Sequence, residues 1–372
     1  MKLLCVRANH FKNCADGYEI DLLARSKKTA EDKEYELQEI APDLYVYNTA
    51  AFIGKNASGK TSALELLDAA YSILGDFRLA GKHYSYQDVE LEIYFYHDGN
   101  IYLYETTLSE EHSLASAAQF HDEHIYKKQY YKTNLKEIYD KNTFKEMTEF
   151  MDLPADTSKV FFVLKDIKTR AVYFDSYDHG TDTFSLAFKA MERFSIGTDI
   201  LNAVLRIFDD NIESLSKLDE RNYRLVFHGE EYTLSDTQLS FMLSSGTTKG
   251  ILLYVYAAAA LQNGFDLLVD EIENHFHKTL AENLIALFKD KTVNRHNASL
   301  IFSTHYCELL DHMGRQDNIF ICNAGSKLTL SNMYSDYSVR SELLKSRQYY
   351  SNTFKTAVNY DSLMSLKKEL KK

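Results

Sequence analysis

The chain has 372 residues and a formal net charge of −12, with 45% hydrophobic and 26% charged residues. This composition allows a large folded core and excludes wholesale disorder. The acidic balance argues against a chain that grips nucleic acid over a wide surface, because phosphate neutralisation needs clustered lysine and arginine. The four cysteines form no CxxC pair and show no metal-ligand spacing, which indicates reduced thiols in the cytoplasm.

The first elements expected along the chain are strands, a charged excursion and a strand–loop–helix unit. Residues up to about 25 alternate between apolar and polar and predict strands. The charged stretch 25–39 predicts a solvated excursion. Residues 44–54 then form a predicted buried strand that ends in a glycine, and residues 62–74 have the periodicity of an amphipathic helix.

The middle of the chain mixes hairpins with helices. Two runs of alternating residues surround Asp98-Gly99 within 89–108 and predict a hairpin. Residues 110–165 are expected to be helical and polar; their basic cluster KKQYYK (127–132) is either a helix face covered by lysine stems or a small binding patch. Further expected elements are strands at 160–166 and 170–177, a helix at 198–212 and a hairpin at 223–234.

The C-terminal part alternates regularly between helices and strands. The expected elements are a helix at 249–262, a strand at 265–271, a helix at 278–288, strands at 298–305 and 318–323, and a helical tail from about 349. Such alternation predicts a parallel sheet covered on both faces. The predicted fold class is therefore α/β, with a mainly parallel sheet flanked by helices, an antiparallel β lobe and a helical insert.

The strands of the predicted core come from both ends of the chain. We expect residues 1–84 and 240–335 to form this core, residues 85–239 an insert lobe, and residues 336–372 a tail. The N-terminus turns polar after six residues and does not resemble a signal peptide. The longest apolar run, 251–261, is too short to span a bilayer, so we expect a cytoplasmic protein without membrane contact.

A phosphate-binding loop is the most specific motif of the sequence. GKNASGKTS matches the pattern G-x-x-x-x-G-K-[ST] in full and lies between the predicted strand and the predicted helix. Glycines allow consecutive N–H groups to point at one phosphate, and the helix adds its positive end. Lys60 is predicted to contact the β- and γ-phosphates, and Thr61 to bind Mg²⁺. The candidate nucleotide-binding residues are Gly54, Lys55, Asn56, Ala57, Ser58, Gly59, Lys60, Thr61 and Ser62.

Two later strands also end in reactive side chains. LLVDE ends in Asp270, a candidate ligand of Mg²⁺, and Glu271, which is placed to deprotonate an attacking water. IFSTH ends in His305, which could reach a γ-phosphate. Because ligands bind at the carboxyl ends of parallel strands, these side chains and the phosphate loop are expected to form one site.

The order of phosphate loop, LSSGT, LLVDE and STH resembles the ABC-type ATPase heads of the SMC, RecF and OLD-like branch. Within that branch the chain is most similar to the compact ATP-binding proteins of bacterial anti-phage and abortive-infection operons. The resemblance covers most of residues 1–25, 45–75 and 240–325. Its motifs are specific for the ATPase class and less specific for the defence subgroup.

The resemblance implies that two heads close around ATP. Ser244, Ser245 and Gly246 would then cover the nucleotide held by a second copy of the chain. The resemblance also implies that Glu271 is the catalytic base and His305 a switch histidine. A loop across the dimer interface would contain Glu273 and Asn274, with His275 and His277 as further candidates; a zinc site at these histidines is the weaker alternative, since no further ligand cluster accompanies them.

The chain departs from the family pattern at several points. Transporter heads carry LSGGQ where this chain has LSSGT, which disfavours a transporter subunit. The glutamine that joins Mg²⁺ to the insert is not assigned; Gln87, Gln119 and Gln129 are candidates. No heptad run indicates long coiled-coil arms. No second catalytic constellation is visible, so any nuclease or toxin of the system is expected on another polypeptide.

These observations predict an ATPase that dimerises head to head around ATP and Mg²⁺ and acts as a sensor or regulator of a partner effector in anti-phage defence. One alternative is a RecF- or SMC-like ATPase that binds DNA directly in repair or recombination. A non-catalytic scaffold that uses ATP structurally is a third possibility. The intact Asp270–Glu271 pair disfavours the scaffold.

Overall fold

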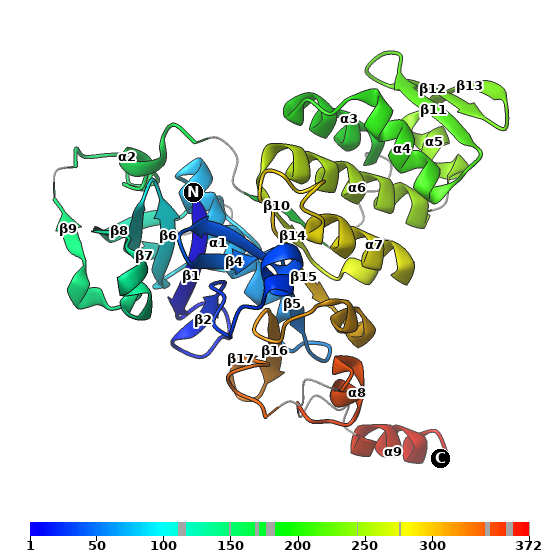
Figure 1. Ribbon diagram of the computed structural model, residues 1–372. Helices are drawn as coiled ribbons and strands as arrows, with labels where there is room; N and C mark the ends of the chain where they lie inside the picture. The colour runs from blue at the N-terminus through cyan, green and yellow to red at the C-terminus, as the bar shows by residue number, and fades with distance from the viewer. Residues whose placement is uncertain are drawn as a thin grey trace.

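One helix lies between two six-stranded sheets and joins them into a single core (Figure 1). The computed structural model describes residues 1–110, 117–148, 150–167, 171–175, 183–243, 245–274, 277–338, 343–354 and 360–371. Helix α1 (Lys60–Asp76) follows the phosphate loop. Its apolar side chains, among them Leu64 and Leu67, are buried against both sheets. The phosphate loop is thus anchored by a helix that is covered on two sides.

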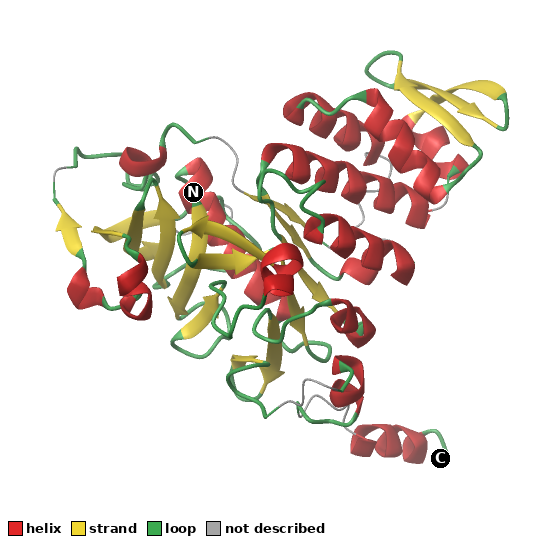
Figure 2. Cartoon of the chain, viewed as in Figure 1, coloured by secondary structure: helices red, strands yellow, loops and turns green. Residues whose placement is uncertain are grey.

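The first sheet is mainly parallel and contains the strands of the predicted site (Figure 2). Its order is β10 (Ala171–Phe174), β14 (Asp266–Val269), β15 (Leu300–Thr304), β5 (Thr49–Ile53), β16 (Ile319–Ala324) and β17 (Leu328–Asn332). Only the last pair is antiparallel. Along β5, Ala50 and Phe52 face α1, whereas Ala51 and Ile53 face the helices of the other layer. Such strands are buried on both faces, as parallel strands usually are.

The second sheet is entirely antiparallel and covers the other side of α1. Its order is β2 (Tyr18–Asp21), β1 (Lys2–Asn9), β6 (Glu90–His97), β7 (Asn100–Ser109), β8 (Gln119–Gln129) and β9 (Lys145–Met147). Strand β1 therefore pairs with the hairpin around Asp98-Gly99, with Val6 opposite Ile93, and β2 pairs with the other edge of β1. The hairpin β3 (Leu37–Ala41) and β4 (Leu44–Tyr47) lies beside this sheet.

A separate lobe of helices and a small sheet packs on the free face of the parallel sheet. It contains α3 (Thr183–Phe194), α4 (Thr198–Phe208), α5 (Asp236–Met242) and α6 (Ser245–Asn263), with strands β11 (Ile212–Lys217), β12 (Asn222–Phe227) and β13 (Glu230–Ser235). Helix α7 (Lys278–Lys289) covers the same face. Smaller elements are α2 (Phe161–Leu164), α8 (Lys345–Tyr350), α9 (Tyr360–Glu369), η1 (Asp32–Glu36), η2 (Lys132–Glu137), η3 (Lys141–Thr143), η5 (Ile272–Asn274) and η6 (Cys307–His312).

The predicted fold class is confirmed: the structure is α/β, with a mainly parallel sheet flanked by helices, an antiparallel lobe and a helical insert. The division of the chain into domains stays a prediction. Two local expectations were wrong. Residues 119–129 and 145–147 lie in the stretch 110–165 that was expected to be helical, yet they form strands β8 and β9. Residues 161–164, expected to be a strand, form helix α2.

The predicted strand at 44–54 is two strands that belong to different sheets, β4 and β5, separated at Asn48. The Asn48 side-chain amide and backbone N–H donate to the carbonyls of Tyr35 and Glu36, which lie within the charged stretch 25–39. Among the helices that the structure describes, none has the length and apolar character needed to cross a membrane.

Candidate active site

The phosphate loop turns sharply between β5 and α1. Ala57 and Gly59 have positive φ angles of 59° and 95°, and the Ser58 N–H donates to the Lys55 carbonyl at 3.2 Å. A side chain at Gly54 would overlap Ser58 and lie 2.5 Å from the Cys322 carbonyl. The motif glycines are therefore needed where the backbone is left-handed or where another backbone approaches closely.

The Lys60 ammonium group lies back over this loop. Its Nζ donates to the carbonyls of Gly54 at 3.2 Å and Lys55 at 3.4 Å, and it lies 3.4 Å from Nδ1 of His305. Burial lowers the pKa of Lys60, and nearby acidic groups, Glu271 among them, oppose this effect. The loop and the end of β15 therefore lie within contact of each other at the carboxyl edge of the sheet.

Thr61 and Asp270 form the predicted metal-binding pair. The Thr61 hydroxyl donates to Oδ2 of Asp270 at 2.8 Å, which joins the first turn of α1 to the end of β14. The other carboxylate oxygen, Oδ1, accepts a hydrogen bond from the Ser303 hydroxyl at 2.5 Å. Burial raises the pKa of Asp270, while the hydrogen bonds from Ser303 and Thr61 lower it in part.

Glu271 and His305 face each other at the ends of neighbouring strands. Oε1 of Glu271 lies 3.4 Å from Nε2 of His305, and both side chains are about 30% exposed. Glu271 has a positive φ of 48°, which is uncommon for a residue with a long side chain. The sequence predicted that Lys60, Asp270, Glu271 and His305 would meet, and the structure brings all four together.

The loop after Glu271 is bound to β15 rather than extended into solvent. The Glu273 carboxylate accepts from the Thr304 hydroxyl at 2.7 Å and from the His305 N–H. The Asn274 side-chain amide donates to Oε2 of Glu271. Sequence reasoning assigned no role to Ser303. The feature that could have pointed to Ser303 is its polar side chain within an apolar strand, because Ser303 is buried on the side of β15 that faces α1, together with Ile301.

The signature LSSGT lies at the junction of α5 and α6. Helix α5 ends at Met242, and α6 begins at Ser245. Ser244 lies outside the described residues. Helix α6 therefore begins within the motif, so the positive end of this helix lies at the signature.

The remaining candidates are scattered. Gln87 binds Asp88 in the turn before β6, while Gln119 and Gln129 lie at the two ends of β8. His277 caps the N-terminus of α7 through Thr279, and His275 lies outside the described residues. Within the described ranges no three histidine, cysteine or acidic side chains are grouped to hold a metal ion.

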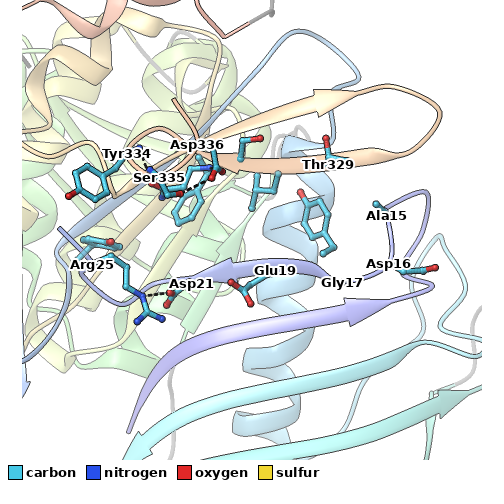
Figure 3. Close-up of a pocket in the computed structure, with 16 residues that line it drawn as sticks. Ala15, Asp16, Gly17, Glu19, Asp21, Arg25, Thr329, Tyr334, Ser335 and Asp336 are labelled. Atoms are coloured by element: carbon cyan, nitrogen blue, oxygen red, sulfur yellow. Dashed lines mark hydrogen bonds and ion pairs between the residues drawn. The ribbon is translucent and has the colours of Figure 1, made fainter. Parts of the chain in front are cut away.

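A pocket of about 380 Å³ lies between β2 and β17 (Figure 3). Arg25 pairs with Asp21 at one side of it, and Asp336 accepts from the Asn332 N–H at the other. The described residues that line this pocket include none of the predicted site residues. The candidate active site is therefore the carboxyl edge of β5, β14 and β15, and this pocket is a separate feature.

The residues at the strand ends fit a nucleotide and Mg²⁺. The buried Ser58 hydroxyl has no hydrogen-bond partner among the described residues, and the loop leaves no space for side chains at its first glycine. Thr61 and Asp270 present two adjacent oxygen ligands, the type that Mg²⁺ prefers. These residues would hold the metal, and Lys60 with the loop N–H groups would hold the phosphates.

Comparison with known proteins indicates the same class of protein as the site does, a nucleotide-binding ATPase. A family model described as "AAA domain, putative AbiEii toxin, Type IV TA system" matches residues 50–311. No curated protein matches the chain significantly. Similar solved structures include an SMC head domain from Thermotoga maritima, with 13% identity, a TM-score of 0.43, and coverage of 89% of this chain and 99% of that chain.

A second similar structure is an Smc head domain with an extended coiled coil bound to the C-terminal domain of ScpA, derived from Pyrococcus furiosus. It has 10% identity and a TM-score of 0.41, and the match covers 100% of this chain and 99% of that chain. The assignment to this class of ATPase therefore rests on the family match and on the sheets and phosphate loop described above. The expected relationship to abortive-infection AAA proteins is confirmed by the family match.

Proposed function

The chain belongs to the AAA-domain family whose model it matches, and on this premise we propose that it hydrolyses ATP between two copies of its ABC-type head. The observation that carries the proposal is the meeting of five side chains at one sheet edge. Lys60 and Thr61 come from the phosphate loop, Asp270 and Glu271 from β14, and His305 from β15. Each has the chemistry that one part of phosphoryl transfer to water requires.

Within one head, the chain's own groups divide the reaction. The loop N–H groups and Lys60 would hold the phosphates, and Thr61 and Asp270 would hold Mg²⁺, which would supply charge neutralisation when bound. Glu271 accepts a proton from the attacking water. His305, in contact with both Glu271 and Lys60, is placed to sense whether the γ-phosphate is present.

The second half of the site is proposed to come from another copy. The signature lies at the start of α6 in the helical lobe, whereas the phosphate loop starts α1 inside the core. Closure around ATP would then favour the dimer, because only the dimer contacts the γ-phosphate from both sides. Hydrolysis of the bound ATP would then allow the two copies to separate.

We further propose that this cycle controls a partner effector, a nuclease or toxin, in anti-phage defence. The support is the family description, which includes a putative toxin of a toxin–antitoxin system. The −12 net charge suits a protein partner better than naked DNA. Pull-down of the chain together with the other proteins encoded in its native operon, in the presence and absence of ATP, tests this part of the proposal.

Trans complementation tests the two-head site. Lys60→Ala removes the phosphate contact of one head, and Ser244→Arg blocks the signature of the other; each protein alone should lose hydrolysis. A mixture forms one intact composite site per heterodimer, so we expect the mixture to regain up to about a quarter of wild-type turnover. A mixture as inactive as its components would contradict the two-head proposal.

A further inference from the structure

The carboxyl end of β15 holds the loop after β14 at two points. At the first point, the Ser303 hydroxyl donates to Asp270 at 2.5 Å and accepts from the Glu271 N–H at 2.7 Å. At the second, the Glu273 carboxylate accepts from the Thr304 hydroxyl and the His305 N–H. The strand therefore donates hydrogen bonds to the loop and also accepts one from it.

The first of these contacts, made by Ser303, involves Glu271, a residue with an unusual backbone conformation. Glu271 has a φ of 48°, a left-handed conformation that costs free energy in a residue with a Cβ and a long side chain. Such a conformation persists when surrounding contacts fix it. Ser303 is fully buried and binds the N–H of Glu271, so its hydroxyl is positioned to stabilise this conformation.

The second point bears on the histidine. Glu273 binds the backbone N–H of His305, not its ring, and binds the preceding Thr304 side chain. The ring is left to contact Lys60 and Glu271. Movement of Glu273 would therefore displace the backbone that carries the ring, together with the loop that contains Asn274.

We propose that Ser303 and Glu273 are positioning residues of the ATPase, Ser303 acting through Glu271 and Glu273 acting through His305. The inference rests on the proposed function. It adds that the base and the histidine are preset within a single head before a second head arrives. The second copy would then complete the phosphate contacts and would not assemble the base.

Ser303→Ala tests the first half. It removes the hydroxyl and leaves the strand intact, and we expect the turnover number at saturating ATP and Mg²⁺ to fall about 10- to 100-fold, the range typical of outer-shell hydrogen bonds at metal sites, such as the one from Ser303 to Asp270. Affinity for a fluorescent ATP analogue should stay within about twofold. Ser299→Ala is the matched control, because this buried serine precedes the same strand and binds the Tyr47 carbonyl, away from the site.

A double-mutant cycle separates positioning from general structural damage. If Ser303 acts through Glu271, Ser303→Ala should lower single-turnover hydrolysis less than twofold in a Glu271→Gln background. The Glu273→Ala effect should likewise disappear in a His305→Ala background, and Glu273→Gln, which keeps one acceptor oxygen, should restore part of the loss. Full multiplicative losses in both backgrounds would overturn the positioning roles.

The outcomes distinguish this inference from the function on which it depends. An active wild type with an equally active Ser303→Ala variant would overturn the inference alone. A wild type that binds ATP but never hydrolyses it would overturn the proposed function and the inference together. Loss of activity in Ser299→Ala as large as that in Ser303→Ala would assign the effect to the strand and would also overturn the inference.

Discussion

Gly54 illustrates how closely single residues are constrained in the phosphate loop. A Cβ at this position would overlap Ser58 and press on the Cys322 carbonyl, so the loop of Gly54→Ala must shift. We expect at least about a tenfold loss of nucleotide affinity, equivalent to about 1.4 kcal/mol. Gly197→Ala is the control, because a Cβ there meets nothing within 4 Å. Equal affinities in a fluorescence titration would contradict this account of the loop.

The sequence was sufficient to predict that Lys60, Thr61, Asp270 and Glu271 lie at one edge of the sheet, because each lies at a fixed place in a motif or at a strand end. It was not sufficient for Ser303. The double hydrogen bond of Ser303 depends on the register between β14 and β15, with Val269 opposite Phe302, and on the left-handed backbone of Glu271. Neither property is encoded by local periodicity.

At the scale of elements, a buried ion pair fixes the charged excursion to the core. Arg315 and Asp317 are 2.7 Å apart and almost fully buried, and Asp317 also accepts from the N–H groups of Arg25 and Ser26. Burial alone would raise the pKa of Asp317, but the hydrogen bonds from Arg315 and Ser26 outweigh it and lower the pKa. Because the folded pKa is lowered, this stabilisation is present above the ordinary pKa of aspartate and is lost as the pH falls through the lower folded value.

We therefore expect Asp317→Asn to lower the free energy of unfolding by about 3 kcal/mol at neutral pH, because it removes the more deeply buried of the two carboxylates, Asp317 and Asp32, that pair with the Arg315 guanidinium. The difference from wild type should shrink as the pH falls to about 3. Thermal melts at several pH values measure this, with the exposed Asp16→Asn as control. A constant difference across that range would rule out the pair as its source.

Local patterns failed where pairing decided the element. Residues 119–129 contain charges and aromatic residues that suit a surface helix, yet they pair along β7, and Phe120 and Ile125 are buried. Lys128 of the basic cluster donates to the Glu137 carbonyl and the Thr143 hydroxyl, which indicates a structural role for this lysine. Residues 161–164 are apolar enough for a strand, but they form a single helical turn.

At the scale of the whole molecule, the central parallel sheet was predicted and the pairing of the first two strands was not. Alternation of helices and strands predicts a parallel sheet directly. The pairing of β1 with β6 joins residues more than 80 positions apart, and no local pattern specifies it. The parallel sheet therefore follows from the sequence more reliably than the antiparallel sheet.

The net charge gives a prediction for the intact protein. Because the formal net charge of the chain is −12, we expect no measurable retention of duplex DNA in a gel-shift assay at 0.15 M salt, with or without ATP. ATP-dependent binding that weakens steeply as salt rises would favour a direct role in DNA repair or recombination. Wild-type protein that has been shown to bind the ATP analogue serves as the positive control.

Hydrolysis by the Glu271 variant tests the central claim most directly. Glu271→Gln keeps the size and polarity of the side chain but removes the proposed base. We expect it to bind ATP with Mg²⁺ as tightly as wild type, to sediment as a dimer only when ATP is present, and to turn over at least about 100-fold more slowly. A variant that hydrolyses ATP at the wild-type rate would contradict the assignment of Glu271, and a wild type without ATP-dependent dimer or turnover would contradict the two-head ATPase itself.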